Sequence, residues 1–196
     1  MDIPEGVNAS KQGNNLVVTG PKGQLEREFK HHIVKLEIKD NKINVSSKDD
    51  RRKLKALVGT WAALAKNIVT GVDKEWEVRL KSVYSHFPMK LAVEGNKFVI
   101  QNFLGEKAPR SAKIVEGTNV KVDKDYIIIT GIDREKVGQT GANIEIAAKV
   151  VGYDRRVFQD GCYLVQKPKS CASAREMQHN SSSEAARAVE SDKHGE

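Results

Sequence analysis

The chain has 196 residues, of which 30% are charged and 39% hydrophobic, and its formal net charge is +7. This length allows one large domain or two small ones. No apolar run approaches the roughly 20 residues that a membrane-spanning helix needs, and the first residues lack the basic and apolar regions of a secretory signal peptide. The sequence therefore predicts a cytoplasmic protein with no membrane partner.

Positive charge is unevenly distributed along the chain. Residues 1–80 contain 15 Lys and Arg against 11 Asp and Glu, residues 81–169 contain 15 against 10, and residues 170–196 contain 3 against 5. This excess of cations over the first 169 residues favours a polyanionic partner such as nucleic acid, although many basic proteins bind none.

One sequence pattern occurs twice, with an offset of about 83 positions. Asp50-Arg51-Arg52-Lys53-Leu54 matches Asp133-Arg134-Glu135-Lys136-Val137. Upstream of these, Leu16-Val17-Val18-Thr19 matches Phe98-Val99-Ile100-Gln101. Because order and spacing hold in both halves, we predict two duplicated domains, at residues 1–80 and 81–169.

The first half is predicted to contain four strands followed by one helix. Short alternating segments between turn residues indicate strands at residues 15–20, 24–29, 34–38 and 42–46. A helix is expected over about residues 49–69, because apolar residues recur there at helical spacing. Ser47 or Asp49 is expected to cap its first turn and Gly71 to end it.

The second half repeats this arrangement. Strands are predicted at residues 89–93, 97–102, 112–115, 119–122 and 126–130, and a helix from Asp133 to about residue 151. Residues 76–83 are expected to join the halves as a stiff strand, and the Asp160-Gly161 turn introduces a closing strand. The predicted fold is α+β, a small antiparallel sheet with one long helix packed on it in each domain. Residues 170–196, rich in Ser, Ala and charge, are predicted to be a disordered tail.

The sequence offers no catalytic or metal-binding residues. Gly138-Gln139-Thr140-Gly141 lacks the Gly-Lys-Ser/Thr ending of a phosphate-binding loop. The adjacent His31 and His32 would point to opposite faces of a strand, so they could not share a metal. Cys162 and Cys171 lack disulfide or zinc spacing, and Cys162 is expected to be buried in the closing strand. We predict no enzyme, no cofactor and no metal site.

Basic residues of the second half are the candidates for binding the phosphates of RNA. One group lies in the first turns of the second helix, where the helix dipole favours anions, and comprises Arg134, Lys136, Gln139 and Thr140. A second group comprises Lys149, Arg155, Arg156, Lys167 and Lys169, and a third comprises Lys107 and Arg110 in a loop that Pro109 stiffens. Ordinary solubility is the alternative for each group.

Two further features decide what kind of RNA recognition we expect. Gly138 and Gly141 admit either a close RNA backbone or close packing of the helix on the sheet, and the sequence leaves both open. The aromatic side chains that could stack on bases are expected to belong to the core, namely Tyr84, Phe87, Phe158 and Tyr163. Recognition of folded RNA by shape is therefore favoured over base stacking.

Three motifs resemble the family of large-subunit ribosomal protein six, in its archaeal and eukaryotic branch. The family's opening is similar to Ile3-Pro4-Glu5-Gly6-Val7 and Val17-Val18-Thr19-Gly20-Pro21-Lys22-Gly23. The start of its second domain is similar to Tyr84-Ser85-His86-Phe87-Pro88-Met89-Lys90-Leu91. Its closing motif is similar to Arg156-x-Phe158-x-Asp160-Gly161-x-Tyr163 with Lys167. Tyr153, where the family usually has Lys or Arg, and Cys162 depart from that motif.

The resemblance implies a structural constituent of the large ribosomal subunit that binds and braces ribosomal RNA near the stalk base and the sarcin–ricin loop. The second domain is then expected to make most RNA contacts, and neighbouring ribosomal proteins at the stalk base are further partners. The alternative is a non-ribosomal protein-interaction module of duplicated α+β domains, which predicts an exposed apolar patch.

Overall fold

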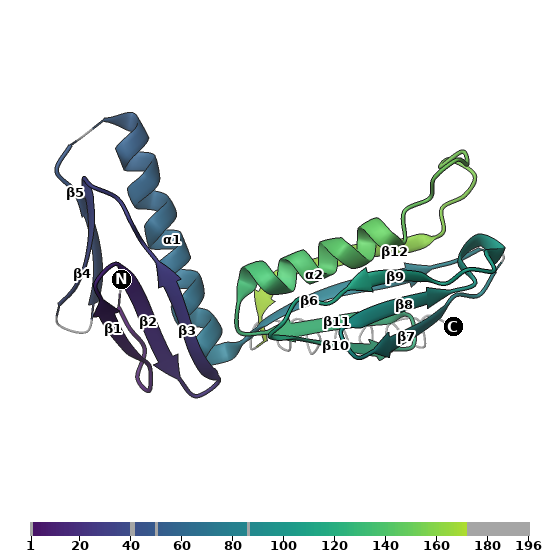
Figure 1. Ribbon diagram of the computed structural model, residues 1–196, viewed down its shortest axis with the longest axis horizontal. Helices are drawn as coiled ribbons and strands as arrows, with labels where there is room; N and C mark the ends of the chain where they lie inside the picture. Colours follow the sequence, from purple (N-terminus) through teal and green to yellow (C-terminus); the bar gives the residue numbers. More distant parts are fainter. Residues whose placement is uncertain (1, 40–41, 50, 86, 172–196) are drawn as a thin grey trace, which may run out of the picture.

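The computed structural model describes residues 2–39, 42–49, 51–85 and 87–171. These residues form two halves, each with its own hydrophobic core and one helix lying on antiparallel strands (Figure 1). The fold is α+β with two similar units, as predicted. Ser170, which the sequence assigned to the tail, is the last residue of a strand, and the rest of the predicted tail beyond Cys171 lies outside the described residues.

The first half contains two antiparallel sheets and one helix. One sheet has three strands, β1 (Asn8–Gln12), β2 (Asn15–Gly20) and β3 (Gly23–Glu28). The other is a hairpin of β4 (Val34–Lys39) and β5 (Lys42–Ser47). Helix α1 (Arg52–Lys74) covers both and buries Trp61, Ala65 and Val72. The four predicted strands are confirmed to within one residue at each end. Strand β1 was missed because its side chains are polar and mostly exposed, which leaves no apolar alternation.

Helix α1 begins and ends later than the sequence predicts. Its N-cap is Arg51, whose side chain makes no capping hydrogen bond. The predicted caps do not fill this role, since the Ser47 hydroxyl bonds to the backbone of Asp49. The helix continues past Gly71, and this glycine serves close packing: a Cβ there would lie 2.0 Å from the carbonyl oxygen of Ile132 in the second half. Helix α1 is followed by Glu75, with a φ of +55°.

The second half also contains two antiparallel sheets and one helix. The four-stranded sheet has the order β10 (Thr118–Asp123), β11 (Tyr126–Gly131), β6 (Trp76–Val83) and β12 (Gly161–Ser170). The three-stranded sheet consists of β7 (Lys90–Glu94), β8 (Lys97–Gln101) and β9 (Arg110–Lys113), with a short 3-10 helix at Phe103–Gly105 before β9. Helix α2 (Arg134–Ala147) packs on this half. All five predicted strands are present, with ends shifted by up to two residues.

Strand β6 belongs to the sheet of the second half and does not merely join the halves. It pairs with β11 on one side and with β12 on the other, and its Val78 and Leu80 are fully buried in the second core. The boundary predicted at residue 80 therefore falls inside a strand, whereas the hydrogen-bonded sheet begins at Trp76.

The halves meet where α1 ends and α2 begins. The indole Nε1 of Trp76 donates to the carbonyl oxygen of Asn67 at 3.1 Å, and Arg134 Nη1 donates to the Asn67 side chain at 3.0 Å. The Arg134 guanidinium also lies 5.1 Å from the centroid of the Trp76 ring, within the range of a cation–π contact. An ion pair of 2.9 Å between Arg27 and Glu135 adds a second link. The sequence-predicted cation Arg134 thus stabilises the junction.

The two glycines of α2 have different surroundings. A Cβ at Gly141 would lie 3.3 Å from Val78 Cγ1 on the sheet beneath the helix, whereas a Cβ at Gly138 would meet only Pro168, at an ordinary contact distance of 3.8 Å. Gly141 therefore serves the packing of α2 on the sheet, and Gly138 has no comparable constraint.

Substitution of these glycines should change stability in opposite directions. We expect Gly138→Ala to stabilise the protein by up to about 1 kcal/mol, the helix-propensity difference between the two residues. Gly141→Val should destabilise it by about 1–3 kcal/mol, because the larger side chain overpacks the helix–sheet contact. Urea denaturation followed by circular dichroism measures both, and equal effects of the two substitutions would contradict this difference.

Candidate nucleic-acid interface

Arg110, at the start of β9, connects three parts of the second half. Its Nε and Nη2 donate to the two carboxylate oxygens of Glu106, at 2.8 and 2.5 Å, and its guanidinium lies 4.1 Å from the centroid of the Phe103 ring. Its Nη1 donates to the carbonyl oxygens of Ala147 and Lys149, at 3.1 and 2.8 Å. A cation is favourable there, because the last carbonyls of a helix lack intrahelical donors and carry the negative end of its dipole.

The sequence predicts Arg110 as a contact for RNA, and the structure shows its guanidinium engaged within the protein. The four hydrogen bonds use four of the five N–H donors of its guanidinium within the protein. Arg110 is therefore a structural residue that holds the end of α2 against β9.

Helix α2 ends at Ala147, four residues earlier than predicted, and an exposed loop of residues 151–159 follows. Asp154 shapes this loop: its side chain accepts the N–H of Arg156 at 2.9 Å, and its carbonyl accepts those of Val157 and Phe158 at 3.1 and 2.9 Å. The loop projects from the end of the second half that lies away from the first half (Figure 1). Arg155 and Arg156 are therefore exposed on a hydrogen-bonded turn.

Residues of the closing motif fix the base of this loop. Asp160 is buried, and its Oδ1 accepts the N–H of Ser85 at 2.9 Å, which ties the start of β12 to the segment after β6. A Cβ at Gly161 would lie 3.2 Å from the carbonyl oxygen of the C-cap residue of α2, so β12 passes the helix end with little room for a side chain. The Tyr163 hydroxyl donates to the carbonyl of Gln159 at 2.9 Å.

An open hollow of about 620 Å³ lies between the C-terminal part of α2, the 151–159 loop and β12. We call it the α2–β12 hollow; the side chains that matter here are the cations Lys149, Arg155 and Arg156 and the apolar residues Ile146, Phe158 and Tyr163. Lys149, Arg155 and Arg156 are exposed. The structure thus brings together three of the five cations that the sequence placed in one group.

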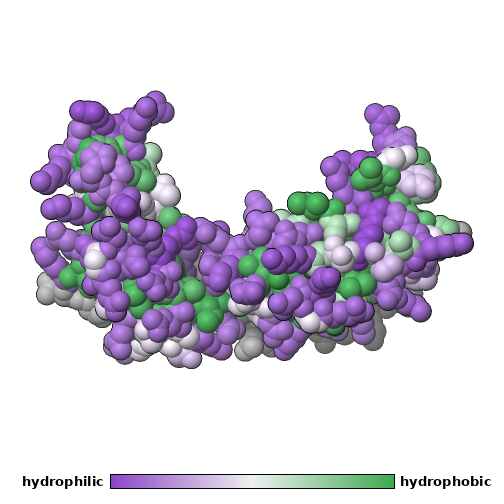
Figure 2. All heavy atoms as spheres, in the orientation of Figure 1, coloured by the Kyte–Doolittle hydropathy of each residue, from purple (hydrophilic) through white to green (hydrophobic). Residues whose placement is uncertain are grey.

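The apolar side chains of the hollow are unusually accessible. Ile146 is 67% exposed, Phe158 40% and Tyr163 41%. Eight of the fourteen exposed large hydrophobic side chains of the described chain lie between residues 146 and 165. Figure 2 shows apolar surface among hydrophilic groups at this end of the second half. The expectation that Phe158 and Tyr163 belong to the core was wrong, as it was for Tyr84 and Phe87, because all four lie beyond the packed layers.

The four residues predicted as RNA contacts at the start of α2 have different surroundings in the structure. Lys136 and Gln139 are exposed, whereas Arg134 is engaged at the junction of the halves. Thr140 is fully buried, where its hydroxyl donates to the carbonyl of Lys136 at 2.9 Å and accepts the N–H of Val115 at 3.2 Å. Its assignment as an RNA contact is therefore corrected, because its hydrogen bonds serve the core.

The remaining predicted cations lie apart from the hollow. Lys107 is exposed on the loop that precedes β9, and Lys167 is exposed on β12. Lys169 is half-buried opposite Glu77 of β6. Pro168, between these two lysines, lies near Gly138 in the first half of α2, a helix whose 14 residues span about 21 Å. The sequence group from Lys149 to Lys169 is therefore not one cluster.

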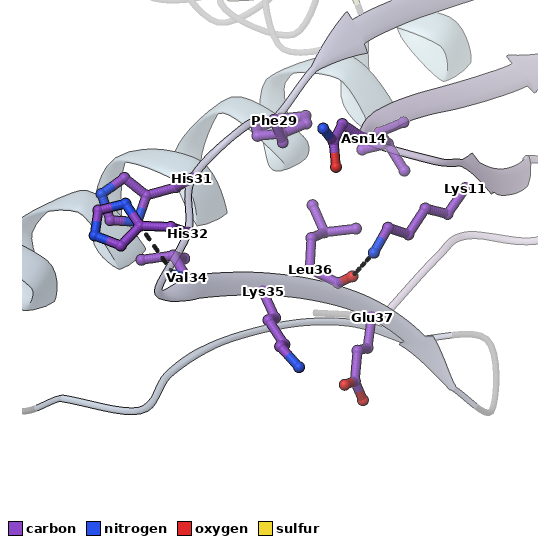
Figure 3. A pocket seen from close by; sticks show the side chains of 10 residues that line it. Lys11, Asn14, Phe29, His31, His32, Val34, Lys35, Leu36 and Glu37 are labelled. Carbon is purple, nitrogen blue, oxygen red and sulfur yellow. Dashed lines mark hydrogen bonds between the residues drawn. The ribbon is translucent and has the colours of Figure 1, made fainter.

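The paired histidines form a separate surface feature of the first half. His31 and His32 lie in the loop between β3 and β4, and their rings stack with centroids 4.5 Å apart instead of pointing to opposite faces (Figure 3). His31 Nδ1 accepts the N–H groups of Ile33 and Val34, both at 3.2 Å. They line an open pocket of about 360 Å³, and the described residues contain no group of three or more His, Cys, Asp or Glu that could hold a metal.

The thiol of Cys162 is buried, as predicted. It is 2% exposed, and burial raises its pKa to about 12. Because a thiolate is the reactive form of cysteine, this residue acts as a small apolar side chain in β12.

The described chain is thus a basic α+β protein of two similar units, with cationic and apolar side chains combined at one end of the second unit. Within the described ranges, no helix is long and apolar enough to cross a bilayer. Residues 3–75 and 87–161 match the family model of Ribosomal protein L6.

Curated relatives agree with this match. The large ribosomal subunit protein uL6 of Methanosarcina mazei is 46% identical over 167 residues, which cover 85% of this chain and 95% of the relative. Those of Methanothrix thermoacetophila and Ignicoccus hospitalis are both 48% identical, over 85% and 84% of this chain and 95% and 91% of the relatives. The chain therefore belongs to the ribosomal protein L6 family. This confirms the predicted family and the prediction of a structural ribosomal protein that is no enzyme.

The contact between Glu106 and Arg110 should make stability depend on pH. The hydrogen bond from Arg110 lowers the pKa of Glu106 below its usual value of 4.5, against a smaller opposing effect of burial. The carboxylate thus favours the folded state at pH values above 4.5, and this contribution is lost as the pH falls through the lowered pKa of the folded protein.

We therefore expect Glu106→Gln to destabilise the protein at pH 7 and the difference from wild type to shrink in acid. Urea denaturation at a series of pH values measures this. Glu116→Gln, an exposed glutamate on the same half, is the control and should show no such trend. A difference between Glu106→Gln and wild type that stays constant down to pH 3 would contradict the prediction.

Proposed function

We propose that this protein is a structural constituent of the large ribosomal subunit, on cytoplasmic ribosomes, and that it binds and braces ribosomal RNA near the stalk base and the sarcin–ricin loop. The second half supplies most contacts with the RNA, and neighbouring ribosomal proteins at the stalk base are further partners. The observation that carries this proposal is the cluster of Lys149, Arg155 and Arg156, exposed on a base that hydrogen bonds of Asp160 and Arg110 hold in place.

Such a cluster suits the sugar–phosphate backbone of folded RNA. Each cation that neutralises a phosphate releases condensed counterions, and arginine can bond two phosphate oxygens at once. Because Asp154 and Asp160 fix the loop before binding, little conformational freedom is lost when RNA docks. The exposed polar residues Lys107, Lys136, Gln139 and Lys167 are additional contacts in this proposal.

The protein-interaction module was the other function considered, and it predicts an exposed apolar patch. Such a patch is present between residues 146 and 165. Part of it lines the same hollow as three cations, however, and the family of the chain is ribosomal. The patch is therefore better explained within an RNA-binding surface than as the site of a non-ribosomal module.

The double variant Arg155→Ala/Arg156→Ala should weaken binding to purified large-subunit ribosomal RNA and flatten its dependence on salt. Each lost phosphate contact lowers the slope of log K against log[KCl] by about one, so we expect a reduction of about two. Filter binding over a range of KCl concentrations measures the slope. The control Arg52→Ala/Lys53→Ala removes the same charge from the first half and should leave the slope unchanged. An unchanged slope in the Arg155/Arg156 variant would remove these residues from the site.

Association with the ribosome is tested directly by co-sedimentation. We expect the full chain to sediment with large ribosomal subunits depleted of their own copy of this protein, at low salt. Failure to do so, with the chain remaining folded in the supernatant, would contradict the proposed function.

A further inference from the structure

We propose that the α2–β12 hollow holds one unpaired base of the bound RNA against Phe158 and Tyr163, while the three cations around it bind the flanking phosphates. This inference rests on the proposed function and adds a mode of recognition to it. The sequence had favoured recognition by shape alone, on the expectation that these aromatic side chains belong to the core.

Neutralisation of phosphates alone does not account for the lining of the hollow. Phosphate contacts need cations and N–H donors, yet apolar side chains line the same hollow as the cations. Ile146, Phe158 and Tyr163 are each more than a third exposed, so their apolar surface gains from being covered. A nucleobase offers an apolar face for such contacts together with polar edges that remain accessible to water or to the protein.

The hollow has the dimensions and the rigidity of a ligand site. Its volume of about 620 Å³ falls within the range of about 300–1,000 Å³ that is typical of small-molecule pockets. Phe158 is held by its backbone bond to Asp154 and lies 5.0 Å, between ring centroids, from Tyr153. The Tyr163 hydroxyl is bonded to the Gln159 carbonyl. The Tyr163 ring is thus tied to the loop through its hydroxyl, and the Phe158 ring packs against that of Tyr153.

Charge favours a nucleotide over an apolar protein segment as the occupant. The described residues that line the hollow include three cations, Lys149, Arg155 and Arg156, and one carboxylate, that of Glu145. The negative end of the α2 dipole, which would repel phosphate, is covered because Arg110 bonds the carbonyls of Ala147 and Lys149. An anionic ligand with an apolar face matches this combination of side chains.

The experiment uses the full chain and two RNA hairpins that differ in one group. The first hairpin carries a single bulged 2-aminopurine nucleotide, and the second carries an abasic nucleotide at the same place, so both present the same phosphates. We expect the first to bind about tenfold more tightly and its 2-aminopurine fluorescence to be quenched on binding. Equal affinities without quenching would overturn the base site while leaving RNA binding intact. Binding of neither hairpin at low salt would contradict the proposed function itself.

Variants assign the effect to the hollow. Phe158→Ser should remove the preference for the first hairpin and leave both the affinity for the abasic hairpin and the salt dependence unchanged. Val157→Ser, in the same loop but outside the lining of the hollow, is the matched control and should keep the preference. Ile146→Gln, on the exposed face of α2, repeats the test without altering the loop. A preference that survives both Phe158→Ser and Ile146→Gln would overturn the proposal.

Discussion

The guanidinium of Arg110 holds the end of α2 against the start of β9, and the loop that carries Arg155 and Arg156 begins just beyond this contact. It donates to the carbonyl of Ala147 at the end of the helix, to the carbonyl of Lys149 just beyond it and to both oxygens of Glu106, an arrangement that a lysine ammonium could not reproduce because it lacks the planar fork. The helix ends at Ala147, and the chain continues into the loop that presents Arg155 and Arg156. A cation that serves the fold thus lies next to the exposed cations that we propose to bind RNA.

The sequence predicted the strands well, because they are short apolar or alternating segments bounded by turn residues: β4 and β11 alternate in burial, and β2 and β8 contain continuous buried runs. It failed for β1, whose exposed polar side chains carry no such signal. It also could not separate cations and hydroxyls that bond within the protein from those that face solvent. Arg110 and Thr140 look like surface contacts until their hydrogen-bond partners from distant parts of the chain are known: Ala147, whose carbonyl accepts from Arg110, and Val115, whose N–H donates to Thr140. The exposure of Phe158 and Tyr163 was hidden for the same reason, since periodicity does not show where a core ends.

The C-terminal ends of the two helices lead to different parts of the structure. The 23 residues of α1 run directly into Glu75 and β6, so the C-terminal end of this helix joins the halves. The 14 residues of α2 end at the free side of the second unit, and about a dozen residues of loop intervene before β12. In the duplicated units, one helix end thus connects the halves, and the other leads into the proposed RNA-binding loop.

The close approach of Gly71 to Ile132 bears on how the protein responds to force. With the backbone of α1 against that of the second half, and with Trp76 and Arg134 bonded across the same place, the junction has no slack for a hinge. Helix α1 is about 34 Å long and points away from this junction (Figure 1). When the second unit is bound to a larger assembly, the first unit acts as a stiff lever. A force applied at the end of the first unit that lies away from the junction then exerts a torque on the second unit.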